Sequence, residues 1–405
     1  MSYSDTQAKA IHELCKVIDC EHKTAPYVKD SEFLVVRTSN VRDGRLVMAD
    51  MKFTTKTGFD EWTQRAVPTH GDVLFTREAP AGESCLVPEN KKICMGQRMV
   101  MLRPNKAKVD PFFLSIILAT EKCKFDILRL SIGSTVSRIN ISDIKKLKVP
   151  APPLPEQRQI AEILSTWDKA IVTTEKLIAA SQQQKKALMQ QLLTGKKRFA
   201  GFSEEWEEVR LLDIGKCITG LTYSPSDTVD DNGMLVLRSS NIQGGKLAFD
   251  DNVFVKSDLK VKSKTKDGDI LICVRNGSKN LIGKSALIKG RASNEAHGAF
   301  MSLYRCQYPD YIFQLFQTNE YYRQVNRNLG ATINSINNSD LHDFRFIIPT
   351  DKNEISMISK CLTSADQEID ALQSKLAYLK QEKKALMQQL LTGKRRVVLE
   401  AETSL

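Results

Sequence analysis

Lys-Lys-Ala-Leu-Met-Gln-Gln-Leu-Leu-Thr-Gly-Lys occurs twice in this chain of 405 residues, as Lys185–Lys196 and again as Lys383–Lys394. The two copies are 198 residues apart, close to half the length of the chain. Solenoid repeats have periods of about 20–50 residues, so a period this long indicates two similar halves in tandem. Such a chain can carry an approximate two-fold axis. That symmetry suits a partner that is itself two-fold, and duplex DNA is the commonest such partner.

A heptad pattern of apolar residues leads into each copy of the repeat. In the first half it runs from Pro155 to about Leu193, and its tracks are Ile160, Trp167, Thr174, Ser181, Leu188 and Leu164, Ile171, Ile178, Lys185, Leu192. In the second half the tracks are Ile358, Ala365, Leu372, Leu379, Leu386 and Leu362, Ile369, Leu376, Lys383, Leu390. Sustained heptads favour a coiled coil, and a buried stripe in a helical bundle is the alternative. Because the segments between the two patterns are not helical bundles, we expect the two helices to pair with each other.

Proline and glycine mark the expected ends of both helices. Pro150–Pro155 blocks helix before the first, and Pro349 stands in the same place before the second. Gly195 and Gly393 stand where a C-terminal cap belongs, each followed by basic residues that suit a helix end. A helix of about 39 residues is about 58 Å long. The repeat therefore ends each helix, which favours a role in partner contact or in closing the coiled coil over base reading.

The segments 1–150 and 200–348 have mixed strand and loop patterns with shared landmarks. Leu34–Asn40 has a counterpart in Leu235–Asn241, and Gly71–Phe75 has one in Gly268–Ile272, which predicts a turn entering a buried strand. We expect an α+β fold with two globular domains and two long helices. The predicted divisions are 1–150 (first domain), 151–197 (first helix), 198–349 (second domain), 350–397 (second helix) and 398–405 (tail).

Composition favours a soluble, reduced protein with a polyanionic partner. Hydrophobic residues make up 41% and charged residues 26% of the chain, as in globular proteins. The longest apolar stretch, Phe112–Ala119, is too short to span a bilayer, and Met1–Ala10 shows no signal peptide. Nine scattered cysteines favour a cytoplasmic location. The net charge of +11 is compatible with a charged surface that only keeps the protein in solution. The more specific hypothesis is that the protein binds nucleic acid.

Catalytic and metal-binding signals are weak. Gly277–Ser285 resembles a phosphate-binding loop but has five residues between its glycines where that loop needs four, so we expect a basic turn before a strand. Asp110–Phe113 resembles an adenine-methylase motif without a glycine-rich cofactor loop, and we expect a helix start there. Cys15, Cys20 and His22 have no second pair of ligands at zinc spacing, so a structural role is favoured for these cysteines. We predict no catalytic residue and no metal site.

Basic and amide-bearing turns are plentiful, and these residue types bond phosphates and base edges. Each turn by itself also suits an ordinary solvated surface, but the turns recur near equivalent places in both halves. The predicted DNA-binding residues are His22, Lys23, Thr24, Arg77, Ser134, Thr135, Arg138, Thr222, Tyr223, Arg275, Asn276, Lys279 and Asn334.

These residues together resemble the specificity subunit of a type I restriction–modification system, over nearly the whole chain. The most specific parts are Val149–Gln157, Leu188–Lys196, and Arg198 and Phe199 with Phe202 and Trp206. Asp19 and Cys20 with His22 and Thr24, and also Gly220–Tyr223, resemble common openings of that family's recognition domains. The second copy departs from the pattern at Thr350–Glu354, where Pro-Leu-Pro-Glu-Gln is lost. This departure leaves the entry angle of the second helix open.

The resemblance implies two target recognition domains separated by an antiparallel coiled coil. Each domain would read one half of a split, asymmetric site in double-stranded DNA, and the coiled coil would set the gap between the halves. The implied partners are two methyltransferase subunits and two restriction subunits, which would carry the S-adenosylmethionine, ATP and Mg²⁺. Two other hypotheses remain: a coiled-coil scaffold that meets DNA only incidentally, and a self-sufficient methylase or nuclease.

Overall fold

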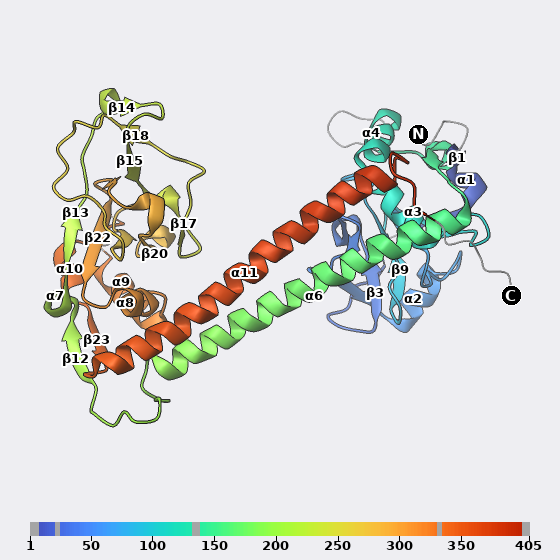
Figure 1. The fold of residues 1–405 in the computed structure, drawn as a ribbon. Coiled ribbons are helices and arrows are strands. Elements are labelled where there is room, and N and C mark those ends of the chain that lie inside the picture. The colour runs from blue at the N-terminus through green and yellow to red at the C-terminus, as the bar shows by residue number, and fades with distance from the viewer. Residues whose placement is uncertain (1–7, 21–24, 132–137, 330–333, 399–405) are drawn as a thin grey trace. The chain divides into compact units, whose positions relative to one another are not determined.

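The computed structural model describes residues 8–20, 25–131, 138–329 and 334–398. The chain forms two compact units, one of residues 1–175 with 375–405 and the other of residues 176–374. The division crosses both of the long helices, α6 (Leu154–Leu192) and α11 (Lys352–Leu390). Each unit therefore consists of a lobe and a part of each long helix, and Figure 1 labels many of the elements. Lobe 1 is residues 8–150 and lobe 2 is residues 207–348.

Lobe 1 is built on a four-stranded antiparallel sheet in the order β2-β10-β7-β8 and a three-stranded sheet in the order β6-β3-β9, in which β3 and β9 are parallel. Two further pairs are β1-β11 and β4-β5. The strands are β1 (Ala8–Ala10), β2 (Cys15–Asp19), β3 (Phe33–Val36), β4 (Val41–Arg42), β5 (Arg45–Leu46), β6 (Lys52–Thr54), β7 (Val73–Thr76), β8 (Ser84–Leu86), β9 (Lys92–Met95), β10 (Met99–Pro104) and β11 (Lys148–Pro150). The helices are α1 (Ile11–Leu14), α2 (Lys56–Trp62), α3 (Pro111–Leu118), α4 (Glu121–Leu130) and α5 (Ile141–Lys146).

Lobe 2 repeats this topology with β13-β22-β19-β20 in place of the four-stranded sheet and β14-β18-β15-β21 in place of the other. Its strands β15 and β21 are parallel, like β3 and β9. The strands are β12 (Glu207–Arg210), β13 (Gly215–Thr219), β14 (Thr228–Val229), β15 (Met234–Leu237), β16 (Ile242–Gln243), β17 (Lys246–Leu247), β18 (Phe254–Val255), β19 (Ile270–Cys273), β20 (Ser285–Leu287), β21 (Ala296–His297), β22 (Met301–Cys306) and β23 (Arg345–Ile348). The helices are α7 (Leu211–Ile214), α8 (Pro309–Leu315), α9 (Asn319–Asn328) and α10 (Asn338–His342).

The predicted turn into a buried strand is confirmed in both lobes. Gly71 and Gly268 have positive φ angles of +92° and +89°, and the strands β7 and β19 that follow are buried throughout. Between glycine and strand, the Asp72 carboxylate accepts two hydrogen bonds from Arg103, of 2.9 and 2.7 Å. Asp269 and Arg305 make the same pair in lobe 2. A buried carboxylate needs such a partner, and in both lobes the pair lies just before the central strand.

Two weak catalytic motifs are structural, as expected. The Asp110 side chain accepts a hydrogen bond of 2.9 Å from the Phe113 N–H and caps α3, which begins with Pro111. The segment that resembled a phosphate-binding loop is a short 3₁₀ turn, Lys279–Leu281, before strand β20. All nine cysteines are unpaired, and burial raises the pKa of Cys15 to about 12, as suits an inert core thiol.

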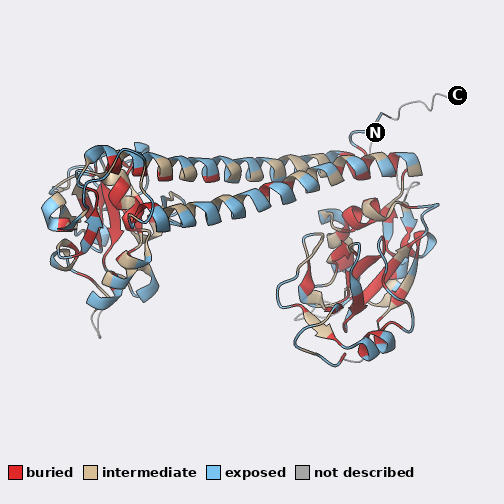
Figure 2. Ribbon diagram, turned by 90° about the horizontal axis from the view of Figure 1, so that it is seen from below, coloured by how far each residue is buried: buried red, intermediate tan, exposed pale blue. Residues whose placement is uncertain are grey.

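The heptad tracks face inward in both long helices. Every track position of α6 and α11 is buried or half-buried, whereas off-track apolar residues such as Leu177 and Tyr378 are exposed. Figure 2 shows the buried residues gathered in the lobe sheets and along part of each helix. No helix among the described residues is long and apolar enough to cross a membrane.

Ion pairs show that the helices pair in antiparallel fashion. In the first unit the Lys383 ammonium donates to Asp168 at 2.7 Å, and in the second Lys185 donates to Asp366 at 2.6 Å. Each residue of one pair is the counterpart, 198 positions away, of a residue in the other. Reciprocal contacts of this kind are the signature of two-fold pairing. The predicted fold class is confirmed: an α+β chain with two globular domains and an antiparallel helix pair.

The repeated segment closes the junction between helix and lobe. At the end of α6, Leu192 and Leu193 enter the hydrophobic core of lobe 2. At the end of α11, Leu390 and Leu391 enter the core of lobe 1. Gly195 and Gly393, with φ of +68° and +69°, then end the helices as C-caps.

An arginine beyond each cap holds the start of the other helix. The Arg198 guanidinium donates two hydrogen bonds, of 2.8 and 2.7 Å, to the buried Glu354 carboxylate near the start of α11. Arg396 does the same to Glu156 near the start of α6. Despite its altered entry, α11 starts at Lys352, the residue equivalent to Leu154 at the start of α6. Ile355, in place of the hydrogen-bonded Gln157, is buried in the core of lobe 2.

Candidate nucleic-acid interface

The predicted DNA-binding residues that the structure describes fall on segments that leave one end of the four-stranded sheet. Strands β2 and β7 both run antiparallel to β10, so their C-terminal ends meet where β10 begins. We call this end the loop edge. In lobe 1 it comprises Asp19–Cys20, Thr76–Glu78, Arg98 and Arg138, and in lobe 2 it comprises Thr219–Tyr223, Cys273–Lys279, Phe300 and Asn334–Ser335.

The loop edge of lobe 1 is centred on Glu78. The main-chain N–H of Arg77 donates to the carbonyl of Arg98 at 2.8 Å, and Glu78 forms a β-bridge with Arg138. The Glu78 carboxylate, which is 17% exposed, lies 3.2 Å from the Arg98 Nε and 3.3 Å from the Arg138 Nε. Both arginines remain half exposed, so this edge presents two guanidinium groups held by one carboxylate.

Arg77, which the sequence predicts as a DNA contact, points into the lobe. Its side chain is 6% exposed, lies 3.2 Å from the Asp19 carboxylate and donates to the Ile139 carbonyl. A guanidinium already buried and paired has few donors left for DNA. We therefore leave Arg77 out of the proposed interface and assign it to the support of the loop edge.

In lobe 2 the structure brings together the predicted residues Arg275, Asn276 and Asn334. The Asn276 N–H donates to the Asn334 carbonyl, and the Asn334 side-chain amide donates to the Gly277 carbonyl at 3.0 Å. The Asn276 amide also donates to the Ser239 hydroxyl at 3.0 Å. The exposed Arg275 guanidinium lies 5.7 Å from the centre of the Phe300 ring, within the range of a cation–π contact.

Thr222 and Tyr223 follow β13 at the same edge of lobe 2, and Gly220 explains how their segment is placed. A Cβ atom on Gly220 would lie 2.1 Å from the Gly298 carbonyl oxygen, so only glycine fits there. Thr222 is exposed, while Tyr223 packs partly on the cluster around Val236. Lys279 is exposed in the 3₁₀ turn beyond Asn276.

Five predicted residues, His22, Lys23, Thr24, Ser134 and Thr135, lie outside the described residues, and their assignment stays a prediction. Sequence reasoning missed Glu78, Arg98 and Phe300. A signal was present for the last two, because Gln97-Arg98-Met99 leads into β10 and Ala299-Phe300-Met301 leads into β22. Aligning the two halves at that methionine would have marked both residues.

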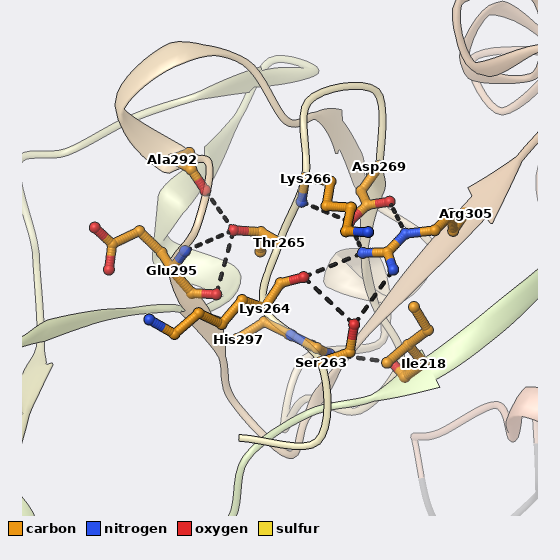
Figure 3. Close-up of polar contacts among 10 residues, drawn as sticks. All are labelled: Ile218, Ser263, Lys264, Thr265, Lys266, Asp269, Ala292, Glu295, His297 and Arg305. Carbon is orange, nitrogen blue, oxygen red and sulfur yellow. Dashed lines mark hydrogen bonds and ion pairs between the residues drawn. The ribbon is translucent and has the colours of Figure 1, made fainter. Parts of the chain in front are cut away.

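A polar network supports the strands of lobe 2, as Figure 3 shows. Asp269 and Arg305 form their paired contact, and the Thr265 hydroxyl, bonded to Ala292 and Glu295, ties the loop before β19 to the segment before β21. His297 is fully buried, and its Nε2 lies 3.0 Å from the Ile218 carbonyl, so this nitrogen carries the proton and donates. Burial lowers the pKa of His297 below its ordinary value of 6.5, which keeps the ring neutral.

The residues at the loop edges are suited to binding rather than to bond breaking. Arginine, lysine and asparagine side chains offer donors, and Phe300 offers an aromatic face. Among the described residues no group of three His, Cys, Asp or Glu side chains is placed to hold a metal ion.

Comparison with known proteins identifies the family. The family model described as the type I restriction modification DNA specificity domain matches the chain twice, at residues 3–181 and 203–381. The chain therefore belongs to this family of specificity subunits.

Two relatives agree with this assignment, and one solved structure shares the fold. The chain is 30% identical to the putative type I restriction enzyme MjaX specificity subunit of Methanocaldococcus jannaschii, over 81% of this chain and 79% of that one. It is 26% identical to the type I restriction enzyme MjaVIII specificity subunit of the same organism, over 89% and 85% of the two chains. The crystal structure of the S subunit from M. genitalium superposes with a TM-score of 0.63 at 14% identity, covering 96% of this chain and 98% of that one.

The family membership confirms two predictions from the sequence. The resemblance to a type I specificity subunit is correct, and the chain is a specificity subunit rather than the enzyme subunit of its system.

Proposed function

We propose that this chain recognises a split, asymmetric sequence in double-stranded DNA, with the loop edge of each lobe reading one half. One observation carries the proposal: the two loop edges share a backbone arrangement but present different side chains. Glu78 and Arg275 occupy equivalent positions after β7 and β19, and Arg98 and Phe300 occupy equivalent positions before β10 and β22. One fold used twice with two reading surfaces suits a site whose halves differ.

The side chains at the loop edges have the chemistry that base reading requires. Arginine pairs with guanine O6 and N7, asparagine with adenine N6 and N7, and a carboxylate accepts from cytosine N4. The net charge of +11 supplies attraction to phosphates that does not depend on sequence. We extend the proposal to the predicted boundaries of the recognition domains, 1–150 and 198–349.

The proposal includes partners that the chain directs to its site in the cytoplasm. These are two methyltransferase subunits and two restriction subunits, which would hold S-adenosylmethionine, ATP and Mg²⁺. The antiparallel helix pair would set the gap between half-sites, because its two helices join the lobes.

The test uses the full chain, together with a type I methyltransferase subunit of the same host, and duplexes from a randomised library. We expect selection of a two-part site, with an affinity that falls steeply as salt rises because phosphate contacts release counterions. Inserting one heptad at matched positions of α6 and α11 should change the selected gap and leave the selected bases unchanged. Selection of no site would contradict the proposal. A selected gap that the insertion does not alter would contradict the role of the helix pair in setting the gap.

A further inference from the structure

Phe300 is an exposed aromatic side chain at the loop edge of lobe 2. It lies at the end of the turn that joins β21 to β22, and 58% of its surface is exposed to solvent. Burying a phenylalanine side chain is favourable, and an aromatic ring that is exposed to water lacks this stabilisation.

The backbone around Phe300 is held firmly. Its carbonyl accepts hydrogen bonds from the N–H groups of Val274 and Arg275, at 3.0 and 3.1 Å. The turn is closed by a bond of 2.9 Å from the Met301 N–H to the Gly298 carbonyl, and the Gly298 N–H donates to Leu237. The ring is therefore presented from a fixed point on the sheet.

The fold does not require an aromatic ring at this position. In lobe 1 the equivalent residue is Arg98, whose carbonyl likewise accepts from the N–H at the end of β7. A charged residue thus fulfils the same backbone role. The backbone of the lobe therefore does not set the identity of residue 300, which leaves the ring free to serve a contact outside the lobe.

The surroundings of Phe300 indicate a nucleobase. Arg275 lies over the ring, and Asn276, Lys279 and Asn334 are neighbours on the same edge. Among the described residues Arg275 makes no ion pair, so its charge is available to a ligand. A base offers a flat face for the ring, and its phosphates offer charge to the cations, whereas an apolar protein surface would leave these donors unpaired.

We infer that Phe300 wedges against a base step of the half-site read by lobe 2, with Arg275 bonding the nucleic acid beside it. The inference rests on the proposed function and adds a specific residue and contact to it. Apolar wedges partly unstack the step that they enter, and pyrimidine–purine steps unstack most easily. Lobe 2 therefore favours such a step where Phe300 makes contact, and lobe 1, with Arg98 in that position, does not.

The test compares Phe300→Ala with Tyr378→Ala, a control on α11 whose side chain is 59% exposed. Both variants are made in the full chain, combined with the methyltransferase subunit, and offered the randomised duplex library. Phe300→Ala should lose affinity for the wild-type site by about ten-fold or more. It should also lose base preference at one step of one half-site, while Tyr378→Ala keeps both.

A second measurement follows the bases directly. With 2-aminopurine at the contacted step, binding of the wild-type chain should raise fluorescence as the base unstacks, and binding of Phe300→Ala should not. Phe300→Arg, which copies lobe 1, covers the case in which the alanine variant does not fold. It should also abolish the rise.

The outcomes separate the inference from the proposed function. If Phe300→Ala or Phe300→Arg selects the same two-part site with unchanged affinity and fluorescence, the wedge is overturned and the proposed function stands. Loss of preference in both half-sites would overturn the assignment to lobe 2. If the wild-type chain selects no site at all, the proposed function itself fails.

Discussion

The loop edges of the two lobes differ in chemistry while sharing their backbone. Lobe 1 holds Arg98 and Arg138 on the Glu78 carboxylate, and lobe 2 places Arg275 over the ring of Phe300. The shared arrangement is fixed elsewhere, by main-chain hydrogen bonds and by an aspartate–arginine pair at the far end of each central strand. Side chains at the edge are therefore free to change without loss of the fold.

The junctions between helices and lobes show the opposite behaviour. There the same residues recur, because each repeated helix end packs into a lobe core and each following arginine meets a buried glutamate. Packing in a core tolerates few changes of volume, whereas a solvated edge tolerates many. The repeat is thus a structural joint between helix and lobe, and its role in partner contact or in closing the coiled coil stays a prediction.

The largest effect is expected from adding one methyl group at the edge of lobe 2. Gly220→Ala would place a Cβ atom 2.1 Å from the Gly298 carbonyl oxygen and should destabilise lobe 2 by about 2–3 kcal/mol, as overpacking does. Amide hydrogen exchange should accelerate at Leu221, whose N–H donates to the His297 carbonyl across this contact, and at Gly298, whose N–H donates to the Leu237 carbonyl.

The matched control is Cys20→Ala, since Cys20 is the residue after β2 as Gly220 is the residue after β13. Lobe 1 already accommodates a buried side chain there, so this change should have a smaller effect. Equal acceleration of exchange in the two variants would show that the two edges are packed alike and would contradict the difference between the lobes.

A smaller effect is expected from releasing the arginines of lobe 1. Glu78→Gln removes the carboxylate that holds Arg98 and Arg138, so both become free to meet phosphates. Affinity for random duplex should rise, and the plot of log K against log salt should steepen by about 1 for each additional phosphate that the arginines neutralise. Filter binding over a salt series measures this slope.

Glu89→Gln is the control for that experiment, because Glu89 pairs with His70 near the opposite end of β7. The control should leave the slope unchanged. An unaltered slope in Glu78→Gln would place the two arginines away from the DNA.

The smallest effect concerns the pH dependence of lobe 2. The buried His297 has a pKa below its ordinary value of 6.5, so below about pH 6.5 the unfolded chain binds a proton that the folded chain does not. The stability contributed by the neutral ring is fully present above that pH and is lost as the pH falls towards the lowered pKa. Protection factors for hydrogen exchange in lobe 2, which are corrected for the pH dependence of intrinsic exchange, should therefore fall between pH 7.5 and 5.5.

Lobe 1 has Met95 at the equivalent position of its parallel strand pair. Lobe 2 should therefore be more sensitive to acid than lobe 1, and His297→Met should remove this difference. If the variant keeps the full acid sensitivity of lobe 2, the histidine is not its source.

The sequence was most informative where the physical rule is local. Heptad spacing predicted both helices and their buried faces, and Gly195 and Gly393 predicted their ends, because a helix turns at a constant rate and a C-cap depends on one residue. The turn residues Arg275, Asn276 and Asn334 were found by residue type, and the structure places them together.

The sequence was least informative for residues whose role depends on strand register. Arg77 has the chemistry of a DNA contact, yet its position one residue past β7 turns it towards Asp19. Glu78, the next residue, points to the other side, since successive side chains alternate across a strand. Neither residue type nor local pattern distinguishes these two neighbours.

The sequence by itself therefore determined that this protein is two like halves with two long paired helices, and it identified the family through motifs that lie mostly at their junctions. Only the tertiary structure decided which side chains meet at each loop edge. Glu78, Arg98 and Arg138, like Arg275 and Phe300, are far apart in the chain and are brought together by hydrogen bonds between strands. Helical periodicity can be recognised from residues that are close in the chain, whereas the register of a sheet is set by contacts between residues that are far apart in it.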